Sequence, residues 1–275
     1  MINKFSSILK LGFAASLIAA LSSNVSAQAI SVRDVNNYLK KRDDGKNVSL
    51  FHRLELSYGM TYGRASLAIN DRLRDPSNFN VITGRSRATT FNYRSASGYA
   101  GVYFPLSYFS NNTMMALSTG FYGVANVWDL GNISLDDTKV TKYEAADMFF
   151  GLPVGVDFIY GGEATMNKQD KVTLRGGVGL MPYFAVGELA DGSQNYSKVG
   201  FHPYVKAEIG FFAAVEWKIK GMIVAGSRTI YDYNTGNPNL QDSDYYYSMN
   251  MKIRPTYTVG IAVFPFSFGW ENDKW

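Results

Sequence analysis

Residues 201–220 read Phe-His-Pro-Tyr-Val-Lys-Ala-Glu-Ile-Gly-Phe-Phe-Ala-Ala-Val-Glu-Trp-Lys-Ile-Lys. Every odd position is apolar, and the even positions carry His202, Tyr204, Lys206, Glu208, Glu216, Lys218 and Lys220. A period of two predicts a β-strand with one apolar and one polar face. The stretch is far longer than the roughly 5–6 residues usual in globular strands, and a tilted strand crosses a bilayer in roughly 9–11. It therefore predicts one transmembrane strand over 201–220.

The composition agrees with a membrane barrel. The chain has 275 residues, of which only 18% are charged, and it contains 19 Tyr, 18 Phe and 26 Gly. Its mean hydropathy is near zero, as expected when only every second residue of a strand faces lipid. The chain has no cysteine, which excludes a disulfide scaffold and a thiolate metal site.

The N-terminus has the pattern of a cleaved export signal. Lys4 and Lys10 precede or flank the apolar run Leu11–Leu21, and Val25-Ser26-Ala27 is a small-residue cleavage site. We expect a signal peptide over 1–27, a periplasmic N-terminal segment over 28–49, and a barrel domain over 50–275. Removal of the two signal lysines lowers the formal net charge from +4 to +2, which argues against a nucleic-acid partner.

Alternating segments recur along the whole domain. They predict strands over about 50–63, 89–106, 113–128, 145–160, 171–187, 201–220, 222–233 and 245–266. Long polar connections over 64–88, 129–144, 188–199 and 234–244 alternate with short ones. The sequence thus predicts an all-β fold, a transmembrane antiparallel up-and-down β-barrel of eight strands with short periplasmic turns and longer extracellular loops.

Aromatic side chains mark the predicted strand ends. Tyr62 and Trp128 lie on the outer side, and Tyr103, Trp217 and Trp270 on the periplasmic side, as in two interfacial girdles. The alternative is a soluble barrel with an aromatic core, which needs shorter strands and a mostly polar outer face.

The strand number, loop alternation, girdles and aromatic last strand Val263–Phe268 resemble a known group. They are similar to the small eight-stranded outer-membrane β-barrel proteins of Gram-negative bacteria, the OmpA-barrel and OmpX kind, and to the outer membrane protein β-barrel domain of Bacteroidetes-type bacteria. The resemblance covers about residues 50–275 and implies a place in the cell outer membrane. One departure is that Gly269–Lys274 separates the last strand from Trp275.

An eight-stranded barrel leaves an interior just wide enough for side chains. Charges there must be paired or hydrated, because an unpaired buried charge costs several kcal/mol. The predicted inward charges are seven positive and six negative, which favours a salt-bridged core that closes the lumen. A narrow channel lined by the same charges, or a barrel accessory to secretion, is the alternative. The set is Arg53, Glu55, Arg94, Asp147, Asp157, Arg175, Lys206, Glu208, Glu216, Arg228, Asp232, Lys252 and Arg254.

The first predicted loop is basic and could bind lipopolysaccharide phosphates through bidentate guanidinium groups. Its cations are Arg64, Arg72, Arg74, Arg85 and Arg87, set against Asp71 and Asp75. The equally open alternative is a solvated loop. The other expected partners are outer-membrane lipid, the barrel-assembly machinery during biogenesis, and a surface or envelope protein.

The sequence has only two histidines, His52 and His202. Ser193 or Ser197, His202 and Glu208 could form a Ser–His–acid set of the kind used by lipid-modifying enzymes, but the spacing does not require it. We therefore expect no catalytic residue, metal or cofactor. The predicted function is a non-enzymatic outer-membrane barrel with a structural or surface-interaction role.

Overall fold

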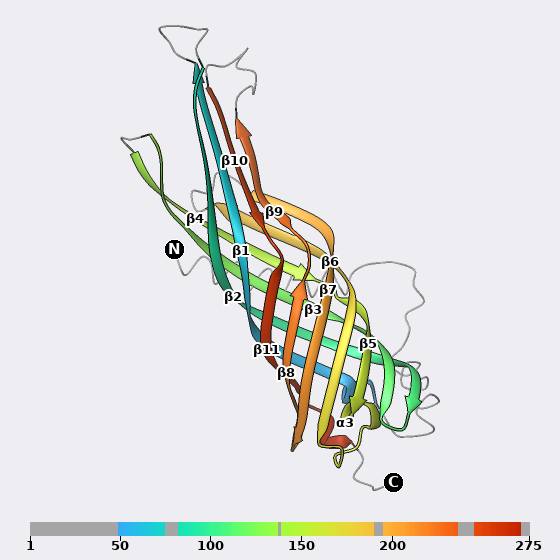
Figure 1. Cartoon of the computed structure of the whole chain (residues 1–275). Helices are drawn as coiled ribbons and strands as arrows, with labels where there is room; N and C mark the ends of the chain where they lie inside the picture. Colours follow the sequence, from blue (N-terminus) through green and yellow to red (C-terminus); the bar gives the residue numbers. More distant parts are fainter. Residues whose placement is uncertain (1–48, 75–81, 137–138, 190–194, 236–244, 271–275) are drawn as a thin grey trace.

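The computed structural model describes residues 49–74, 82–136, 139–189, 195–235 and 245–270, and their strands form one antiparallel sheet that closes on itself (Figure 1). The helical elements of the described residues are η1 (Leu50–Arg53), the one-turn helix α3 (Gly162–Thr165) and η2 (Ser267–Gly269). The strands are β1 (Leu54–Arg74), β2 (Ile82–Ser110), β3 (Thr113–Asp136), β4 (Lys139–Gly151), β5 (Val154–Gly161), β6 (Val172–Leu189), β7 (Asn195–Ala213), β8 (Val215–Val224), β9 (Arg228–Thr235), β10 (Tyr245–Ile253) and β11 (Thr256–Phe264).

The ring is closed by β1, which pairs with β2 on one side and with β11 on the other. From β11 the wall continues through β8, β7, β6, β4 and β3 back to β2, and β5 continues the line of β4 between β3 and β6. All of these pairings are antiparallel. Each strand of this ring therefore has partners on both sides, which leaves the ring without an open edge. Outside the ring β10 pairs with β1 and β9, and β9, the last strand in the order, pairs only with β10 among the described strands.

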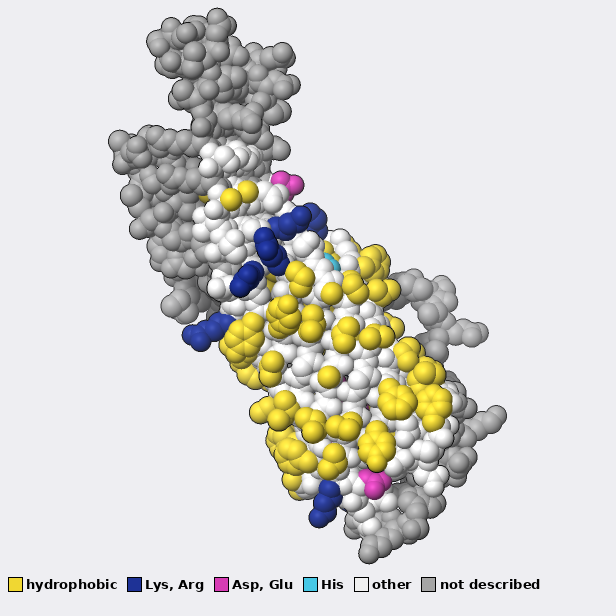
Figure 2. Space-filling view, in the orientation of Figure 1, with side chains coloured by type: hydrophobic (Ala, Val, Ile, Leu, Met, Phe, Trp, Pro, Cys, Tyr) yellow, Lys and Arg dark blue, Asp and Glu magenta, His cyan; other side chains and the backbone are white. Residues whose placement is uncertain are grey.

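The outer face of the barrel is apolar. Large exposed side chains recur at every second position on one face of β1, β5, β6, β7, β8 and β11, among them Val178, Ile209, Ile219, Val259 and Ile261. Figure 2 shows hydrophobic side chains spread over the lower and middle part of the molecule. A patch of this size is not stable against water but suits the hydrocarbon of a bilayer. The predicted fold class, an antiparallel transmembrane β-barrel, is confirmed.

The stretch 201–220 is not one strand, as predicted, but parts of two. The chain turns at Ala214, which has a left-handed backbone (φ 62°), and the predicted turn at Gly221 was wrong. Ala213 lies opposite Val215 and Ile209 opposite Ile219, so each odd residue of β7 pairs with an odd residue of β8. Paired residues share one face of a sheet. The alternation therefore passes through the turn without a break, and periodicity could not reveal it.

Two of the predicted long loops are largely strand. β1 and β2 remain paired up to Arg74 and Ile82, and β3 and β4 up to Asp136 and Lys139. These hairpins extend beyond the closed wall (Figure 1). We call this the long-hairpin end. The opposite, short-turn end contains the β2–β3 and β7–β8 turns, α3 and η2.

A bulge separates β10 from β11. Ala65 pairs with Ile253 and Tyr62 with Tyr257, so two residues of β1 lie opposite three, Arg254 to Thr256. Pro255 has no backbone N–H and cannot donate to the ladder. One extra residue exchanges the two faces of a strand. The sequence pattern predicts one unbroken strand over 245–266, so its assignment of inward and outward side chains is right only after the bulge.

The consequence is a correction to two predicted lumen residues. Met251 and Ile253 are buried, whereas Lys252 and Arg254 are exposed. The predicted phase for these four side chains was wrong. After the bulge Tyr257, with about half of its surface exposed, points outward as expected.

Arg94 and Asp232 were also assigned wrongly to the lumen. On β2 the buried side chains are Ser95 and Ser97, and Arg94 is exposed on the opposite face. Between β9 and β10 a second register shift follows Met251, and Asp232 is exposed opposite Asn250. In both strands the charged residue lies on the outer face, at or beyond the edge of the apolar belt.

The predicted signal peptide and nearly all of the predicted N-terminal segment lie outside the described residues, as does Trp275. Within the described part, no helix has both the length and the apolar character needed to cross a membrane.

Candidate functional site

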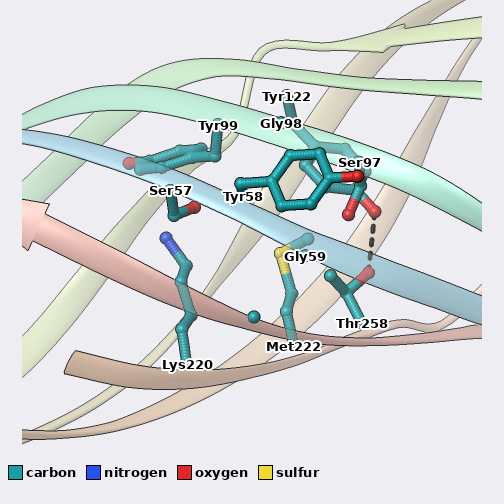
Figure 3. A pocket seen from close by; sticks show the side chains of 11 residues that line it. Ser57, Tyr58, Gly59, Ser97, Gly98, Tyr99, Tyr122, Lys220, Met222 and Thr258 are labelled. Atoms are coloured by element: carbon teal, nitrogen blue, oxygen red, sulfur yellow. Dashed lines mark hydrogen bonds between the residues drawn. The ribbon is translucent and has the colours of Figure 1, made fainter.

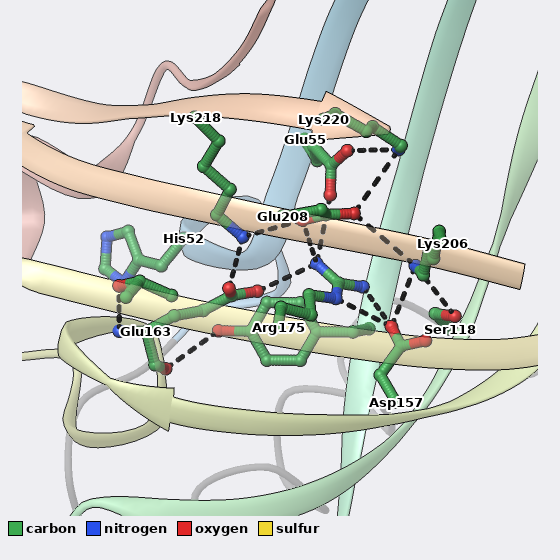
Figure 4. Close-up of polar contacts among 12 residues, drawn as sticks. His52, Glu55, Ser118, Asp157, Glu163, Arg175, Lys206, Glu208, Lys218 and Lys220 are labelled. Carbon is green, nitrogen blue, oxygen red and sulfur yellow. Dashed lines mark hydrogen bonds and ion pairs between the residues drawn. The ribbon is translucent and has the colours of Figure 1, made fainter. Parts of the chain in front are cut away.

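The polar centre of the lumen is organised around Arg175, on β6. Its guanidinium contacts four carboxylates: Nη1 lies 3.0 Å from Glu55, 2.9 Å from Glu163 and 3.7 Å from Glu208, and Nη2 lies 2.5 Å from Asp157. These side chains expose at most 2% of their surface. They come from β1, β5, β6, β7 and helix α3, so one cation connects much of the wall (Figure 4).

Three lysines complete this network. Lys206 Nζ lies 2.8 Å from Asp157 Oδ2 and donates to Ser118, and Lys220 Nζ lies 2.5 Å from Glu55 Oε1. Lys218 contacts Glu163 and lies 3.1 Å from Glu208. We call these eight side chains the lumen network. Its four cations balance its four carboxylates: Arg175, Lys206, Lys218, Lys220, Glu55, Asp157, Glu163 and Glu208.

The connection between β5 and β6 folds into the barrel. Residues 161–167, which include α3, are all buried, and Glu163 reaches the lumen network from this turn. Tyr103 donates from its hydroxyl to the carbonyl of Glu163 over 3.1 Å. Arg53 and Arg175 lie 5.0 and 5.2 Å from the Tyr103 ring. Ion pairs of Glu163 and the hydrogen bond from Tyr103 therefore hold the turn at the short-turn end, and cation–π contacts with the two arginines hold Tyr103 in place.

The C-terminal segment contributes to the same closure. Trp270 is buried and donates its indole N–H to the carbonyl of His52 over 3.2 Å. Tyr103 and Trp270 were predicted as girdle residues, and their burial shows this to be wrong. The His52 ring, in η1, accepts from the backbone N–H of Ser49. Burial, and then the neighbouring Arg53, lower the pKa of His52, which favours the neutral, accepting ring.

Tyrosine and methionine side chains fill the lumen on the side of the lumen network that faces the long-hairpin end. Tyr99, Tyr122, Tyr204, Met181 and Met222 are all buried there. Lys220 Nζ lies 3.5 Å from the centre of the Tyr99 ring. A cavity beside this layer has a volume of about 10 Å³ and is lined by Tyr99, Tyr122 and Lys220 among others (Figure 3). It has room for about one water molecule.

A second charged layer lies toward the long-hairpin end. Arg228 Nη2 lies 2.7 Å from Asp147 Oδ2, and Asn126 donates to the same carboxylate. The Arg228 guanidinium lies 4.4 Å from the Phe149 ring. The Tyr183 ring stacks on Phe149 at 5.1 Å. The described lumen is therefore filled in layers over its height.

The structure thus separates the thirteen predicted lumen residues into groups. Glu55, Asp157, Arg175, Lys206 and Glu208 meet in the lumen network. Asp147 and Arg228 form the second layer, and Arg53 and Glu216 are buried near the short-turn end. The remaining four, Arg94, Asp232, Lys252 and Arg254, lie on the outer face.

Sequence reasoning omitted three members of the network. Lys218 and Lys220 share the parity of Glu216, and the alternation of 201–220 places them on its polar face, so a signal was present. Glu163 lies in a turn, where no periodicity exists to assign its direction. Its role depends on the chain folding back into the barrel mouth.

The predicted basic loop is a hairpin rather than a loop. Arg64 is exposed on β1 opposite Asn92, and the backbones of Arg72, Arg74, Arg85 and Arg87 lie in the β1–β2 ladder. The side chains of the last four lie outside the described part of the structure. The prediction that these arginines contact lipopolysaccharide stays a prediction.

The possible Ser–His–acid set is not assembled in the described residues. His202 is buried and stacks on Tyr183 at 4.4 Å, whereas Ser197 is exposed. Glu208 points into the lumen network from six residues further along β7. Ser193 lies outside the described residues. The same residues contain no cluster of three or more groups suited to hold a metal ion.

No protein-family model matches the chain, and no curated protein sequence matches it either. Three solved outer-membrane proteins are similar in structure. Ail of Yersinia pestis is 13% identical over 77% of this chain and 98% of its own, with a TM-score of 0.32. The Escherichia coli protease OmpT is 11% identical over 76% and 96% (TM-score 0.36), and Pseudomonas aeruginosa OprG 9% over 75% and 94% (0.37). At these identities the likeness concerns the fold alone.

The closed antiparallel wall, the apolar outer belt and the polar, filled lumen define an integral transmembrane β-barrel protein. The finer resemblance to the OmpA and OmpX kind, or to the Bacteroidetes-type domain, stays a prediction.

Proposed function

We propose that the protein is a closed, non-conducting barrel that holds its long hairpins at the cell surface, with a structural or surface-interaction role. The lumen network is the observation that carries this proposal. All eight of its side chains are almost fully buried, and its charges balance. A passing ion would have to displace several ion pairs at once, and breaking one buried pair already costs about 3–5 kcal/mol.

The orientation follows from the two ends of the barrel. Bacterial membrane barrels have short periplasmic turns and longer extracellular connections. The short-turn end, with α3 and Trp270, then faces the periplasm, and the hairpins of β1–β2 and β3–β4 face outward. Binding commonly resides on segments that a rigid scaffold positions. A surface or envelope protein would be bound by these hairpins, and the barrel-assembly machinery is the expected partner during biogenesis.

Planar-bilayer recording of the refolded protein tests the closed lumen. We expect no discrete conductance steps from wild type, with insertion shown by the mobility difference between unheated and heated samples in SDS gels. The matched variant Lys218→Ala with Glu163→Ala removes one cation and one carboxylate and keeps the charge balance. This double variant should open a path for ions through the lumen and give small, discrete conductance steps. Steady openings of the wild-type protein would instead identify a narrow channel.

The proposal includes the absence of enzymatic activity. His202 and Ser197 lie on opposite faces of β7, which does not favour a shared nucleophilic site. Mass spectrometry of lipid A from cells with and without the protein should give identical spectra. A deacylated or acylated species that depends on the protein, and disappears in His202→Gln, would show that the barrel modifies lipid.

A further inference from the structure

The outer face of β1, β2 and the β10–β11 junction carries four exposed cations above the apolar belt. They are Arg64, Arg94, Lys252 and Arg254. Figure 2 shows Lys and Arg side chains gathered along the upper edge of the hydrophobic surface on this face of the molecule. Three of the four were expected inside the lumen, so this surface was not recognised from the sequence.

The strand register makes these cations neighbours. Arg64 lies opposite Asn92, so Arg94 is its diagonal neighbour on the same face of the sheet. The backbone N–H of Arg254 donates to the carbonyl of Arg64 over 2.9 Å, and Lys252 lies opposite Ser66. Diagonal neighbours lie within about 7–8 Å, within reach of one ligand for side chains as long as these. We call these four residues the outer cation cluster.

The cluster begins where the membrane belt ends. Tyr62 lies opposite Tyr257 on one side and opposite Arg94 on the other, so the cluster starts at the level of a tyrosine pair. Tyr62 and Tyr257 are 47% and 53% exposed. Exposed Tyr side chains of membrane proteins gather at the lipid headgroups. From there to the level of Ser66 the cluster rises roughly 13 Å, at about 3.3 Å per residue.

The cluster is not neutralised by the described part of the protein. None of its four cations forms an ion pair with another described residue, and Asp232, opposite Asn250, is the exposed acid on the adjoining strand. The wall at β7 differs, because Val199 and Phe201 expose 74% and 71% of their surfaces toward its outer end. One sector of the barrel rim is therefore basic, while at least one other sector remains apolar.

We propose that the outer cation cluster binds the phosphates of a lipid headgroup in the outer leaflet. Three guanidinium groups can each donate two N–H bonds to phosphate oxygens, and the lysine adds a fourth charge. The acyl chains of the same lipid would lie on the apolar face directly below, which includes Tyr58 and Val259. This inference rests on the proposed placement in an outer membrane. It assigns a phosphate site to the wall of the barrel, not to the tips of its hairpins.

The test compares two variants with the same change in net charge. Arg94→Gln with Arg254→Gln removes two cluster cations, and Lys171→Gln with Lys198→Gln removes two exposed cations from elsewhere. Each barrel is inserted into phosphatidylcholine nanodiscs doped with lipopolysaccharide, re-extracted in mild detergent, and assayed for retained lipopolysaccharide. We expect about a tenfold loss for the cluster variant and no loss for the control, because charge-assisted hydrogen bonds are lost only in the first.

Two further arms identify the source of the phosphate. With enzymatically dephosphorylated lipopolysaccharide, wild type and cluster variant should retain equal amounts. Millimolar inorganic phosphate should not compete if a membrane lipid is the ligand. Competition by free phosphate, or equally strong binding of heparin in detergent without lipid, would assign the cluster to a water-borne anion and overturn the proposal.

The readouts separate this inference from the proposed function. A barrel that fails to enter the nanodisc contradicts the membrane placement itself. A barrel that enters, but retains the same amount of lipid in wild type and cluster variant, contradicts the phosphate site alone. Because all four substituted side chains are exposed, both variants should fold like wild type, as the mobility difference between unheated and heated samples will show.

Discussion

The inner and outer faces of the same wall use the same cationic side chains in opposite ways. Inside, Arg175 has four carboxylates within 4 Å and is almost fully buried. Outside, Arg64 and Arg94 are exposed and have no ion-pair partner among the described residues. A charge in the lumen is compensated by the protein itself. A charge at the outer rim is compensated by groups outside the protein. Whether a residue is at an odd or an even position of its strand decides which of these two environments its side chain enters.

The largest expected effect comes from moving residues between these faces. Deletion of Pro255 removes the extra residue of the bulge, so that Met251 would exchange faces with Lys252. We expect little or no folded protein, seen as loss of the faster-migrating band in unheated SDS gels. Pro255→Ala is the matched control, since it keeps the residue count and should cost no more than about 1 kcal/mol. Normal folding of the deletion variant would show that the bulge does not fix the phase.

The next effect tests compensation inside the lumen. Arg175→Met leaves four carboxylates against three lysines and should lower the free energy of unfolding by about 3–5 kcal/mol. Arg94→Met, on the outer face, should change it by less than about 0.5 kcal/mol in detergent without phosphate. Urea unfolding of the two refolded variants measures the difference. Similar losses at both positions would mean that burial of the network contributes little to stability.

The sequence predicts those parts of the barrel in which the alternation is unbroken. On β1 from Leu54 to Tyr62 and on β5, the side chains predicted to face outward do so. A period of two carries this information because successive side chains alternate between faces. The lumen positions of Glu55, Asp157 and Glu208 follow from the same argument.

The remaining side-chain directions could not be derived, because the alternation of apolar and polar residues does not show where the chain turns or where a bulge inserts a residue. At the β7–β8 turn around Ala214, odd-numbered residues stay on the same face before and after the turn, so the alternation continues unchanged. The bulge at Pro255 reverses parity, and the charges of Lys252 and Arg254 were interpreted as marks of a polar lumen. Glu163 enters the network from a turn, where its direction depends on packing against Tyr103. Charge alone therefore does not distinguish a lumen from a headgroup surface.

The smallest expected effect separates charge from geometry within the outer cation cluster. Arg94→Lys with Arg254→Lys keeps both charges but removes two bidentate forks. We expect retained lipopolysaccharide to fall about two- to threefold, against about tenfold for the glutamine pair, because a lysine contacts phosphate as a single point. Retention should also decrease more steeply with added salt, since a mainly electrostatic contact is screened. Wild-type retention by the lysine pair would mean that charge density alone holds the lipid, and a loss equal to that of glutamine would mean that the paired hydrogen bonds do.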